Sequence, residues 1–251
     1  MDLGLRGKGV VVTGASKGIG RAIALEFAHE GANVAICARG EQSLMNTRTE
    51  LEATGVKVFA ATCDVADAQS LAAFLDDAHA ALGSVDVLVN NTSGFGISDD
   101  EAGWQKTCSV DIMGTVRATK KVIPWMEAQG GGVIIYTSSI SGMEAGSPPA
   151  YAAAKAAVIS YSKTLAASLA PKGIRVNNIA PGSIEFPGGM WAQIKEHVPD
   201  MYNRVVGTIP FGRLGTPEEV AAAVVFLSSS RASWISGVTL PVDGVQHKGN
   251  F

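Results

Sequence analysis

Short apolar runs alternate with longer helical patterns along this chain of 251 residues. The short runs are apolar at nearly every position, which is typical of strands that helices cover on both faces. They occupy residues 8–13, 33–37, 57–61, 86–90, 132–137, 175–179 and 238–242. Helix-like segments lie near residues 18–30, 41–54, 67–82, 101–128, 150–170 and 217–229. This order predicts an α/β fold, a parallel sheet with helices on both faces and right-handed crossovers.

The alternation breaks once, in residues 183–213, which are rich in Gly and Pro. Long irregular segments in compact folds are often lids or binding loops, so we expect a substrate lid there. No linker and no change of composition divides the rest of the sequence. We therefore expect a single domain over residues 1–251.

Charge and composition exclude several classes of protein. The net charge is −3 and the basic residues are scattered, which leaves no basic tract for nucleic acid and no basic helix for a membrane surface. The longest apolar run, residues 220–227, is far shorter than the roughly 20 residues of a membrane span. No secretory signal is visible. Cys37, Cys63 and Cys108 are far apart and lack metal-ligand spacing, so we expect reduced core thiols in a cytoplasmic protein without a metal site.

The first predicted strand runs directly into a glycine-rich turn, TGASKGIG, at residues 13–20. Its glycines permit a tight turn and let a phosphate approach the backbone, and the helix that follows points its positive end at that anion. Such a turn can also be a simple connection between strand and helix. The strand before it and the helix after it favour a dinucleotide site.

The second predicted strand ends in Ala38 and Arg39, where many dinucleotide folds carry an acid for the ribose hydroxyls. Lys17, in the glycine turn, is a second cation on the same side. Two cations without a carboxylate suit a 2′-phosphate, which predicts NADP(H) rather than NAD(H); the alternative is that Arg39 is a solvated loop charge. Asp64, followed by Val65, either meets the adenine edge or caps the next helix.

A tyrosine and a lysine give the main indication of chemistry. Tyr151 and Lys155 stand four residues apart in an alanine-rich helical stretch, so they share one face of the helix. A fixed ammonium favours the ionised form of a neighbouring phenol, which makes the phenol a usable proton donor or acceptor. Ser139 ends an apolar run 12 residues upstream of Tyr151. Alone, the pair would more often be a surface tyrosine and a snorkelling lysine.

In this order along the chain, the glycine turn, Asn90, Asn91, Ser139, Tyr151 and Lys155 resemble the short-chain dehydrogenase/reductase superfamily. The 3-oxoacyl-(acyl-carrier-protein) reductase type is the most similar. The resemblance covers nearly the whole chain. It implies a single-domain Rossmann fold with a doubly wound, seven-stranded parallel sheet, assembled as a homotetramer or homodimer. It also implies hydride transfer between NADP(H) and a carbonyl compound or secondary alcohol.

The resemblance implies roles for single residues as well. Ser139 orients the substrate carbonyl, Tyr151 donates the proton, and Lys155 binds the nicotinamide ribose and assists Tyr151. Asp111 stands where the family usually carries a catalytic asparagine. Further cofactor contacts are implied for Gly14, Ser16, Lys17, Gly18, Ile19, Gly20, Arg39, Asp64, Val65, Asn91, Pro181, Gly182 and Ile184.

The chain departs from the family pattern at several positions. The turn after the fourth strand reads Asn-Asn-Thr-Ser-Gly, with Gly94 one place late, which predicts a different local turn. Phe186 replaces a threonine whose hydroxyl could hold the cofactor, and Val245 stands where a second glycine often follows. Ser139 lies one residue nearer the tyrosine than in many relatives, which leaves Ser138 as the alternative.

Asp111 is the most consequential of these departures. An asparagine there would hold a water in a proton relay, whereas a carboxylate would also attract the Lys155 ammonium and weaken its influence on Tyr151. We therefore expect an enzyme that turns over, with its basic limb displaced to higher pH. The alternative is that Asp111 points elsewhere and pairs locally.

The sequence leaves the substrate open. Candidate pocket residues are Ser93, Phe95, Met143, Glu144, Glu185, Met190 and Trp191. This mixture suits a partly apolar ketone or alcohol, although each residue could equally pack within a lid. One alternative function is oxidation of a polyol, steroid or aryl carbinol by the same residues. Another is a non-catalytic NADP(H)-sensing protein, for which a complete set of Ser139, Tyr151 and Lys155 would have no use.

Overall fold

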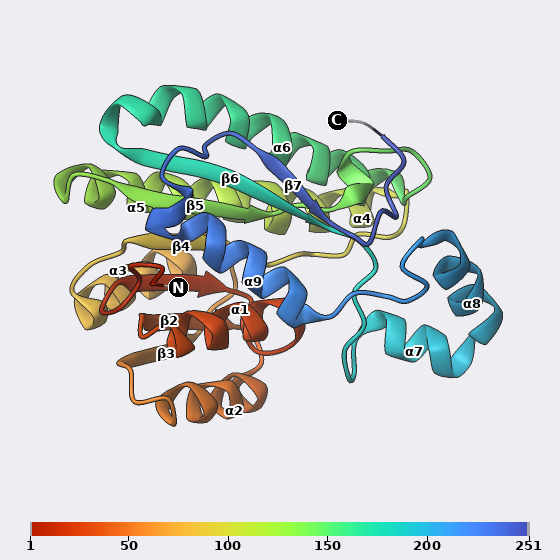
Figure 1. The fold of residues 1–251 in the computed structure, drawn as a ribbon, viewed down its shortest axis with the longest axis horizontal. Coiled ribbons are helices and arrows are strands. Elements are labelled where there is room, and N and C mark those ends of the chain that lie inside the picture. The colour runs from red at the N-terminus through yellow and green to blue at the C-terminus, as the bar shows by residue number, and fades with distance from the viewer. Residues whose placement is uncertain (1, 250–251) are drawn as a thin grey trace.

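The computed structural model describes residues 2–249 and is built on one seven-stranded sheet (Figure 1). The strand order is β3-β2-β1-β4-β5-β6-β7, and every neighbouring pair is parallel. The strands are β1 (Gly9–Thr13), β2 (Asn33–Ala38), β3 (Val58–Thr62), β4 (Val87–Asn90), β5 (Gly132–Thr137), β6 (Ile174–Pro181) and β7 (Thr239–Val242). This arrangement is a Rossmann fold and confirms the predicted fold class.

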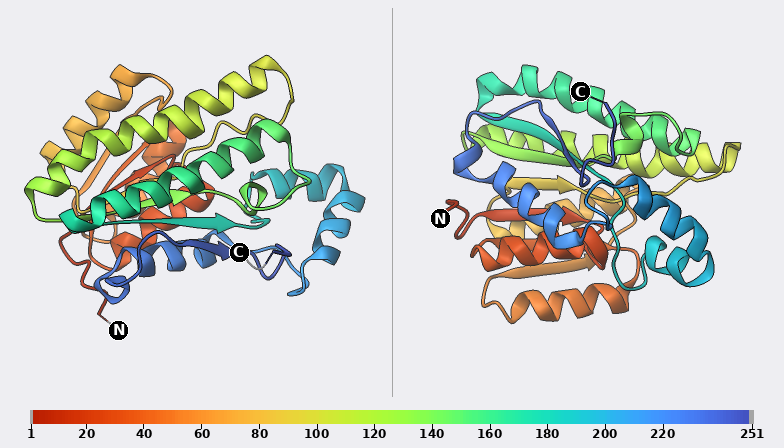
Figure 2. Two further views of the ribbon diagram at one scale, coloured as in Figure 1. Left: turned by 90° about the horizontal axis from the view of Figure 1, so that it is seen from above. Right: turned by 45° about the vertical axis from the view of Figure 1, so that its right-hand side comes forward.

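Helices cover both faces of the sheet, as the edge-on view of Figure 2 shows. The helices are α1 (Gly18–His29), α2 (Glu41–Glu52), α3 (Ala68–Leu82), α4 (Glu101–Thr107), α5 (Thr115–Ala128), α6 (Pro149–Leu169), α7 (Met190–His197), α8 (Pro199–Thr208) and α9 (Pro217–Ser228). Buried residues of α1, α2 and α9 form the core on one face, and those of α3, α5 and α6 form the core on the other. Short 3₁₀ turns lie at Ile140–Gly142 (η2), Ala170–Lys172 (η3) and Ser230–Ala232 (η4).

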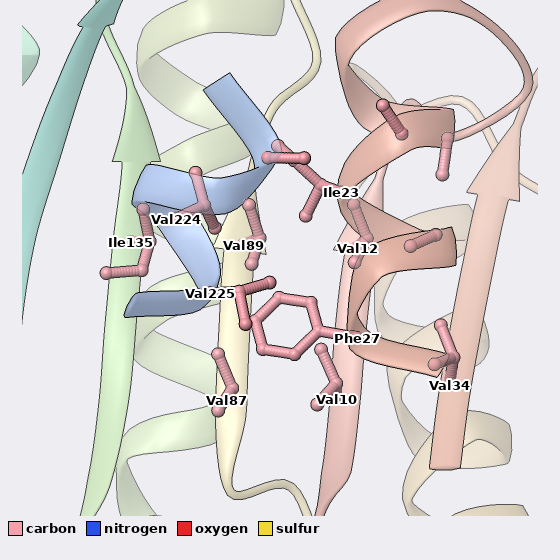
Figure 3. Packing of buried hydrophobic residues seen from close by; sticks show 14 of the residues in the cluster. Val10, Val12, Ile23, Phe27, Val34, Val87, Val89, Ile135, Val224 and Val225 are labelled. Carbon is pink, nitrogen blue, oxygen red and sulfur yellow. The ribbon is translucent and has the colours of Figure 1, made fainter. Parts of the chain in front are cut away.

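The strands bury side chains on both faces, which explains why they read as continuous apolar runs. In β1, Val10 and Val12 belong to the core under α1 and α9, whereas Val11 belongs to the opposite core. Figure 3 shows Phe27 of α1 filling the space between strands and Val225 of α9. Phe27 is fully buried, and truncating such a side chain to alanine typically costs about 3–5 kcal/mol.

The helix predicted over residues 101–128 is interrupted. A π-helical stretch, η1 (Cys108–Gly114), separates α4 from α5. Stretches of this kind occur often at functional sites, because the extra residue changes the direction in which side chains project. Here η1 carries Asp111, and the interruption places this side chain in the interior of the protein.

The expectation of an irregular segment over residues 183–213 is wrong in part, because this segment contains α7 and α8. Both helices lie beyond the carboxyl ends of the strands (Figure 1). None of the residues that the structure describes in α7 and α8 is buried. Both helices are short, and Gly and Pro lie directly before or within them, so the composition of the segment masks them.

The parallel strands bring the predicted site residues to one edge of the sheet. β1 and β4 are neighbours in the sheet, with Val10 paired to Val87 and Val12 to Val89. In the sequence, residues 14–86 lie between these two strands. The chain leaves β1 towards β2 and leaves β4 towards β5, so the connections diverge at this point. In open α/β sheets, ligands bind beyond the carboxyl ends of the strands at such a point. The glycine turn follows β1, and Asn91 follows β4.

Candidate active site

A buried ion pair between Lys155 and Asp111 lies at the centre of the site. Lys155 Nζ is 3.0 Å from Asp111 Oδ1, and the two side chains are 4% and 0% exposed. Lys155 Nζ also donates a hydrogen bond of 3.0 Å to the carbonyl oxygen of Thr137, the last residue of β5. Burial by itself lowers the pKa of Lys155, but attraction to Asp111 and Tyr151 and hydrogen bonding to Asp111 raise it above its ordinary value. The lysine is therefore held in its charged form.

Tyr151 lies one turn before Lys155 on α6 and is half-buried. Lys155 Nζ is 5.6 Å from the centroid of the Tyr151 ring. The four-residue spacing thus places a permanently charged ammonium beside the phenol, as a helix dictates. The hydroxyl-bearing ring and the ammonium therefore lie on one face of α6, at the carboxyl edge of the sheet.

The serine segment after β5 packs directly on α6. The Ser138 hydroxyl donates a hydrogen bond of 2.9 Å to the carbonyl oxygen of Lys155, so its role is to fix the segment. A Cβ on Gly142 would lie 2.7 Å from the carbonyl carbon of Lys155, a contact that only glycine permits. Ser139 begins η2, and its Oγ accepts a hydrogen bond of 3.1 Å from the amide of Ser141. Of the two serines, Ser139 is the better candidate for contact with a substrate.

The second oxygen of Asp111 reaches the loop after β4. Asp111 Oδ2 accepts a hydrogen bond of 2.8 Å from the amide of Gly94. Asp111 therefore joins Lys155 to the residues that follow Asn91, and the alternative of a purely local role is wrong. The sequence did not predict Thr137 or Gly94 as partners of these side chains. Both contribute backbone atoms, which every residue type has.

The glycine turn at residues 13–20 is bound tightly to the strands beside it. The amides of Gly14 and Ala15 donate hydrogen bonds of 2.9 and 3.1 Å to the carbonyl oxygen of Cys37. Asn91 Nδ2 donates to the carbonyl oxygens of Thr13 and Gly14 at 3.2 and 3.1 Å. A Cβ on Gly20 would lie 2.3 Å from the Gly14 oxygen, so glycine is required there.

The first turn of α1 offers uncapped amide groups to an anion. Within residues 2–249, no side chain caps this turn and no acidic residue lies in it. Its amide groups and the positive end of the helix therefore face the crevice without a protein partner of opposite charge. This is the arrangement that a bound pyrophosphate requires.

Phe186 covers part of this turn. A Cβ built on Gly18 would lie 2.5 Å from Phe186 Cζ, and one on Gly189 would lie 2.8 Å from it. The aromatic ring is thus sandwiched between the phosphate turn and the start of α7. The substitution of threonine by Phe186 does more than remove a hydroxyl, because the ring occupies space against the glycine turn.

The cations of the adenine side remain in solvent. Arg39 directly follows β2, and both Arg39 and Lys17 are exposed. Asp64 is exposed as well, and its Oδ1 accepts a hydrogen bond of 3.0 Å from the amide of Ala66. The alternative of Asp64 as the cap of the next helix is wrong, since Asp67 caps α3 by accepting from two amides at 2.8 Å.

The ends of β6 and β7 meet beside the lid segment, with Pro181 paired to Val242. A Cβ on Gly182 would lie 2.7 Å from the Asp243 Cβ, so the residues that directly follow the two strands touch. Val245 adopts a φ of 67°, in the left-handed region. This conformation explains why the family pattern favours glycine at this position.

Known proteins agree with this architecture. Residues 14–245 match the sequence profile of a family described as "Enoyl-(Acyl carrier protein) reductase". An isoepoxydon dehydrogenase of Penicillium expansum is 35% identical, and the match covers 99% of this chain and 98% of that protein. A 3-oxoacyl-(acyl-carrier-protein) reductase of Thermotoga maritima is 36% identical, with 96% and 98% covered. The chain belongs to the short-chain dehydrogenase/reductase family. The resemblance drawn from the motifs is confirmed.

Solved structures of this family share the whole fold. A 7α-hydroxysteroid dehydrogenase complexed with NADH and 7-oxo glycochenodeoxycholic acid has a TM-score of 0.90 and 34% identity, and covers 97% of this short-chain dehydrogenase and 96% of its own chain. An L-sorbose reductase from Gluconobacter frateurii complexed with NADPH and L-sorbose has a TM-score of 0.90 and 35% identity, with 99% and 100% covered. Membership of the family makes this protein an oxidoreductase.

The sequence-predicted pocket residues separate into two groups in this short-chain dehydrogenase. The Phe95 ring stacks on the Tyr151 ring with centroids 5.8 Å apart and planes 8° from parallel, and Ser93 Oγ accepts a hydrogen bond of 3.3 Å from the Phe95 amide. Met143 follows η2, beside the serine segment, and Trp191 lies in the first turn of α7. The first group adjoins Tyr151 and the serine segment, and Trp191 belongs to the segment over residues 183–213.

Glu185 belongs to the packing of the lid segment. Its two oxygens bind Lys195 Nζ of α7 at 2.9 Å and the Tyr202 hydroxyl of α8 at 2.6 Å. Lys195 Nζ lies 5.0 Å from the Tyr202 ring centroid. For Glu185 the alternative interpretation, packing within a lid, is therefore the better one.

Two further findings concern the part of the chain that the structure describes. No group of three or more His, Cys, Asp and Glu side chains there is arranged to hold a metal ion. Among the same residues, every helix is too short or too polar to cross a membrane. The thiols of Cys37 and Cys63 are buried and that of Cys108 is half-buried.

Proposed function

We propose that this protein is an NADP(H)-dependent carbonyl reductase in which Tyr151 is the general acid. The observation that carries the proposal is the buried, charged Lys155 beside the Tyr151 phenol, at the carboxyl edge of the sheet. The Lys155 ammonium is already paired with Asp111, so the fold does not require a phenol beside it. A buried charged group next to a half-buried phenol therefore indicates a functional site. The dehydrogenases and reductases among its relatives act on alcohol and carbonyl groups by name, which supports the same chemistry here.

In the proposed reaction, Ser139 and Tyr151 donate hydrogen bonds to the substrate carbonyl oxygen as negative charge grows on it. Tyr151 then transfers its phenolic proton to that oxygen. Lys155 stabilises the phenolate that remains, and Asp111 holds Lys155 in place and in its charged form. When bound, the reduced nicotinamide supplies the hydride.

Asp111 tempers the effect of Lys155 on the phenol. Its carboxylate lies 3.0 Å from the ammonium and compensates part of the positive charge that Tyr151 would otherwise experience. We propose that Asp111 in this way moves the basic limb of the reaction to higher pH.

The residues present fit the cofactor. The open first turn of α1 suits the pyrophosphate, and Arg39 and Lys17 offer two exposed cations for a 2′-phosphate. The relatives with bound cofactor include one with NADH and one with NADPH, so the preference for NADP(H) rests on Arg39 and Lys17. The other proposed contacts are Gly14, Ser16, Gly18, Ile19, Gly20, Asp64, Val65, Asn91, Lys155, Pro181, Gly182 and Ile184.

NADPH consumption against a varied carbonyl panel tests this function. The panel contains diacetyl, a β-keto ester and an aryl ketone, and we expect turnover of at least one of them. In Tyr151→Phe the ring remains and only the hydroxyl is lost, so kcat falls by about 10²–10⁴-fold. NADPH binding, measured by the fluorescence of the reduced cofactor, stays nearly unchanged. Retained activity in this variant removes Tyr151 from the acid role, and binding without any turnover by the parent points to a cofactor sensor.

We also propose that the protein assembles as a homotetramer. Ala153, Ala156 and Ala157 are exposed on α6, and such small side chains let another helix approach closely. Light scattering at the working concentration measures the assembly directly. A monomeric mass there contradicts the proposal.

A further inference from the structure

We propose that Phe95 selects the substrate. Its ring, held flat against the Tyr151 ring, offers an apolar platform to carbonyl compounds in which a flat ring adjoins the carbonyl group. Aryl ketones and cyclic enones are the chemical classes that fit this description. The inference rests on the proposed function, because it takes Tyr151 as the group that meets the carbonyl oxygen.

Phe95 has a strained backbone. Its φ is 48°, in the left-handed region that bulky residues rarely adopt. Strain of this kind persists only where the surrounding structure enforces it, and it is concentrated at functional sites. A glycine or asparagine would occupy this position with less strain. Phenylalanine here costs stability, which suggests that its aromatic ring has a function.

The structure that enforces this conformation starts at the catalytic ion pair. The amide of Gly94 donates to Asp111 Oδ2 at 2.8 Å, and the other oxygen of Asp111 is held by Lys155. A Cβ on Gly94 would lie 2.8 Å from the carbonyl oxygen of Lys106 and 3.2 Å from Asp111 Oδ2. The loop is thus clamped between α4 and η1 at the residue immediately before Phe95.

The Phe95 ring stacks on the Tyr151 ring and remains largely open to solvent. The ring planes of Phe95 and Tyr151 are 8° from parallel, with centroids 5.8 Å apart. Phe95 is nevertheless 53% exposed. An exposed aromatic face beside a proton donor attracts the flat part of a substrate by stacking and by release of water. A short aliphatic carbonyl compound has no group that reaches this surface.

The test compares two substrates in Phe95→Ala. Loss of one stacking partner corresponds to about 2–10-fold in affinity. We expect KM for an aryl ketone to rise by this factor while KM for diacetyl stays unchanged. Ile97→Ala is the matched control, because Ile97 lies in the same loop and is 68% exposed; it should alter neither KM. An equal change for both substrates, or none for the aryl ketone, overturns the proposal.

Two further variants separate selection from structural damage. Phe95→Tyr keeps a flat ring and should restore the low KM for the aryl ketone. Phe95→Gly relieves the strained φ and removes the ring, so it should be at least as stable as the parent in thermal unfolding and still lose the preference. A preference that follows stability rather than the presence of a ring contradicts the proposal.

A binding measurement distinguishes failure of this inference from failure of the proposed function. Calorimetry measures the aryl ketone binding to the NADP⁺-loaded Tyr151→Phe protein, which retains the stacked ring without the hydroxyl. We expect about 2–10-fold weaker binding when Phe95→Ala is added. If the parent reduces no carbonyl compound and this difference persists, the proposed function fails, substrate selection fails with it, and Phe95 keeps only a role in binding flat rings. If the parent reduces the aryl ketone and the difference is absent, or no binding is detected, Phe95 loses the role.

Discussion

The two ends of the crevice are built differently. At the catalytic end, Lys155 and Asp111 are 4% and 0% exposed, and each is also bound to a backbone group of another element. At the adenine end, Arg39 and Lys17 are exposed side chains that extend from fixed backbone positions. The proposed catalytic groups are therefore held by one another, whereas the cations proposed for the adenine side are held only by the turn and the strand that carry them.

This difference predicts how each end responds to substitution. Removal of one member of a buried ion pair leaves the other charge in a low-dielectric interior without compensation, so effects on stability, activity and pH dependence arise together. Removal of an exposed cation leaves no buried charge behind. It should therefore change only the binding constant of the ligand that this cation contacts. The following variants test whether the contrast is real.

Lys155→Met should have the largest effect. It leaves the Asp111 carboxylate buried without its partner, which costs about 3–5 kcal/mol of unfolding free energy, measured by urea denaturation.

The folded-state pKa of Lys155 is raised. The ion pair therefore stabilises the fold below the unfolded lysine pKa of about 10.4, and the difference between parent and variant shrinks as pH rises through the folded value. Lys163→Met, an exposed position on the same helix, is the control and should cost less than about 1 kcal/mol. Equal losses in both variants would show that the ion pair does not support the fold.

Arg39→Ala should change one property only. A charge-assisted contact with a 2′-phosphate corresponds to about 10–100-fold in affinity, so the Kd for NADPH rises by this factor and the Kd for NADH stays the same. Fluorescence titration of both cofactors measures this, with Arg48→Ala on α2 as the control. A clear preference of the parent for NADH defeats the assignment of the 2′-phosphate site.

Asp111→Asn separates charge from position at the catalytic end. The amide oxygen of asparagine can still accept the Gly94 hydrogen bond, but the Lys155 charge is no longer compensated. We expect the pH–rate profile to move towards acid by about one unit, since the uncompensated ammonium favours loss of the Tyr151 proton. The preference for an aryl ketone should persist. An unmoved profile means that the Asp111 charge does not reach the phenol.

Phe186→Thr tests the region between the two ends, where the ring contacts Gly18. The variant restores a hydroxyl near the phosphate turn, and one hydrogen bond to an anion should tighten NADPH binding by about fivefold. Phe186→Ala removes the ring without adding the hydroxyl. Equal tightening in both variants would assign the effect to the ring and not to the lost hydroxyl.

The fold followed from the sequence because its signals are local. Continuous apolar runs separated by helical patterns predicted all seven strands, and most of their ends agree within two residues. The positions of Tyr151 and Lys155 on one helix face also follow from spacing alone. The segment over residues 183–213 was only partly predictable, because its Gly and Pro content masks the two short helices α7 and α8.

The connections within the site could not be read in this way. The Lys155 contact with the Thr137 carbonyl and the Asp111 contact with the Gly94 amide join residues that are 18 and 17 positions apart. Both depend on backbone groups, whose partners are fixed by packing and not by residue type. The left-handed conformation of Phe95 could not be read from the sequence either, because bulky residues rarely adopt it.

The most direct test of the central claim uses NADPH that carries deuterium at C4 of the nicotinamide ring. Mass spectrometry of the product formed from an aryl ketone reports whether the label is transferred to the new carbinol carbon. We predict labelled alcohol from the parent protein and a loss of product of about 10²–10⁴-fold in Tyr151→Phe with cofactor binding retained. Full product formation by Tyr151→Phe, or no labelled product from any ketone despite tight NADPH binding by the parent, would contradict the account.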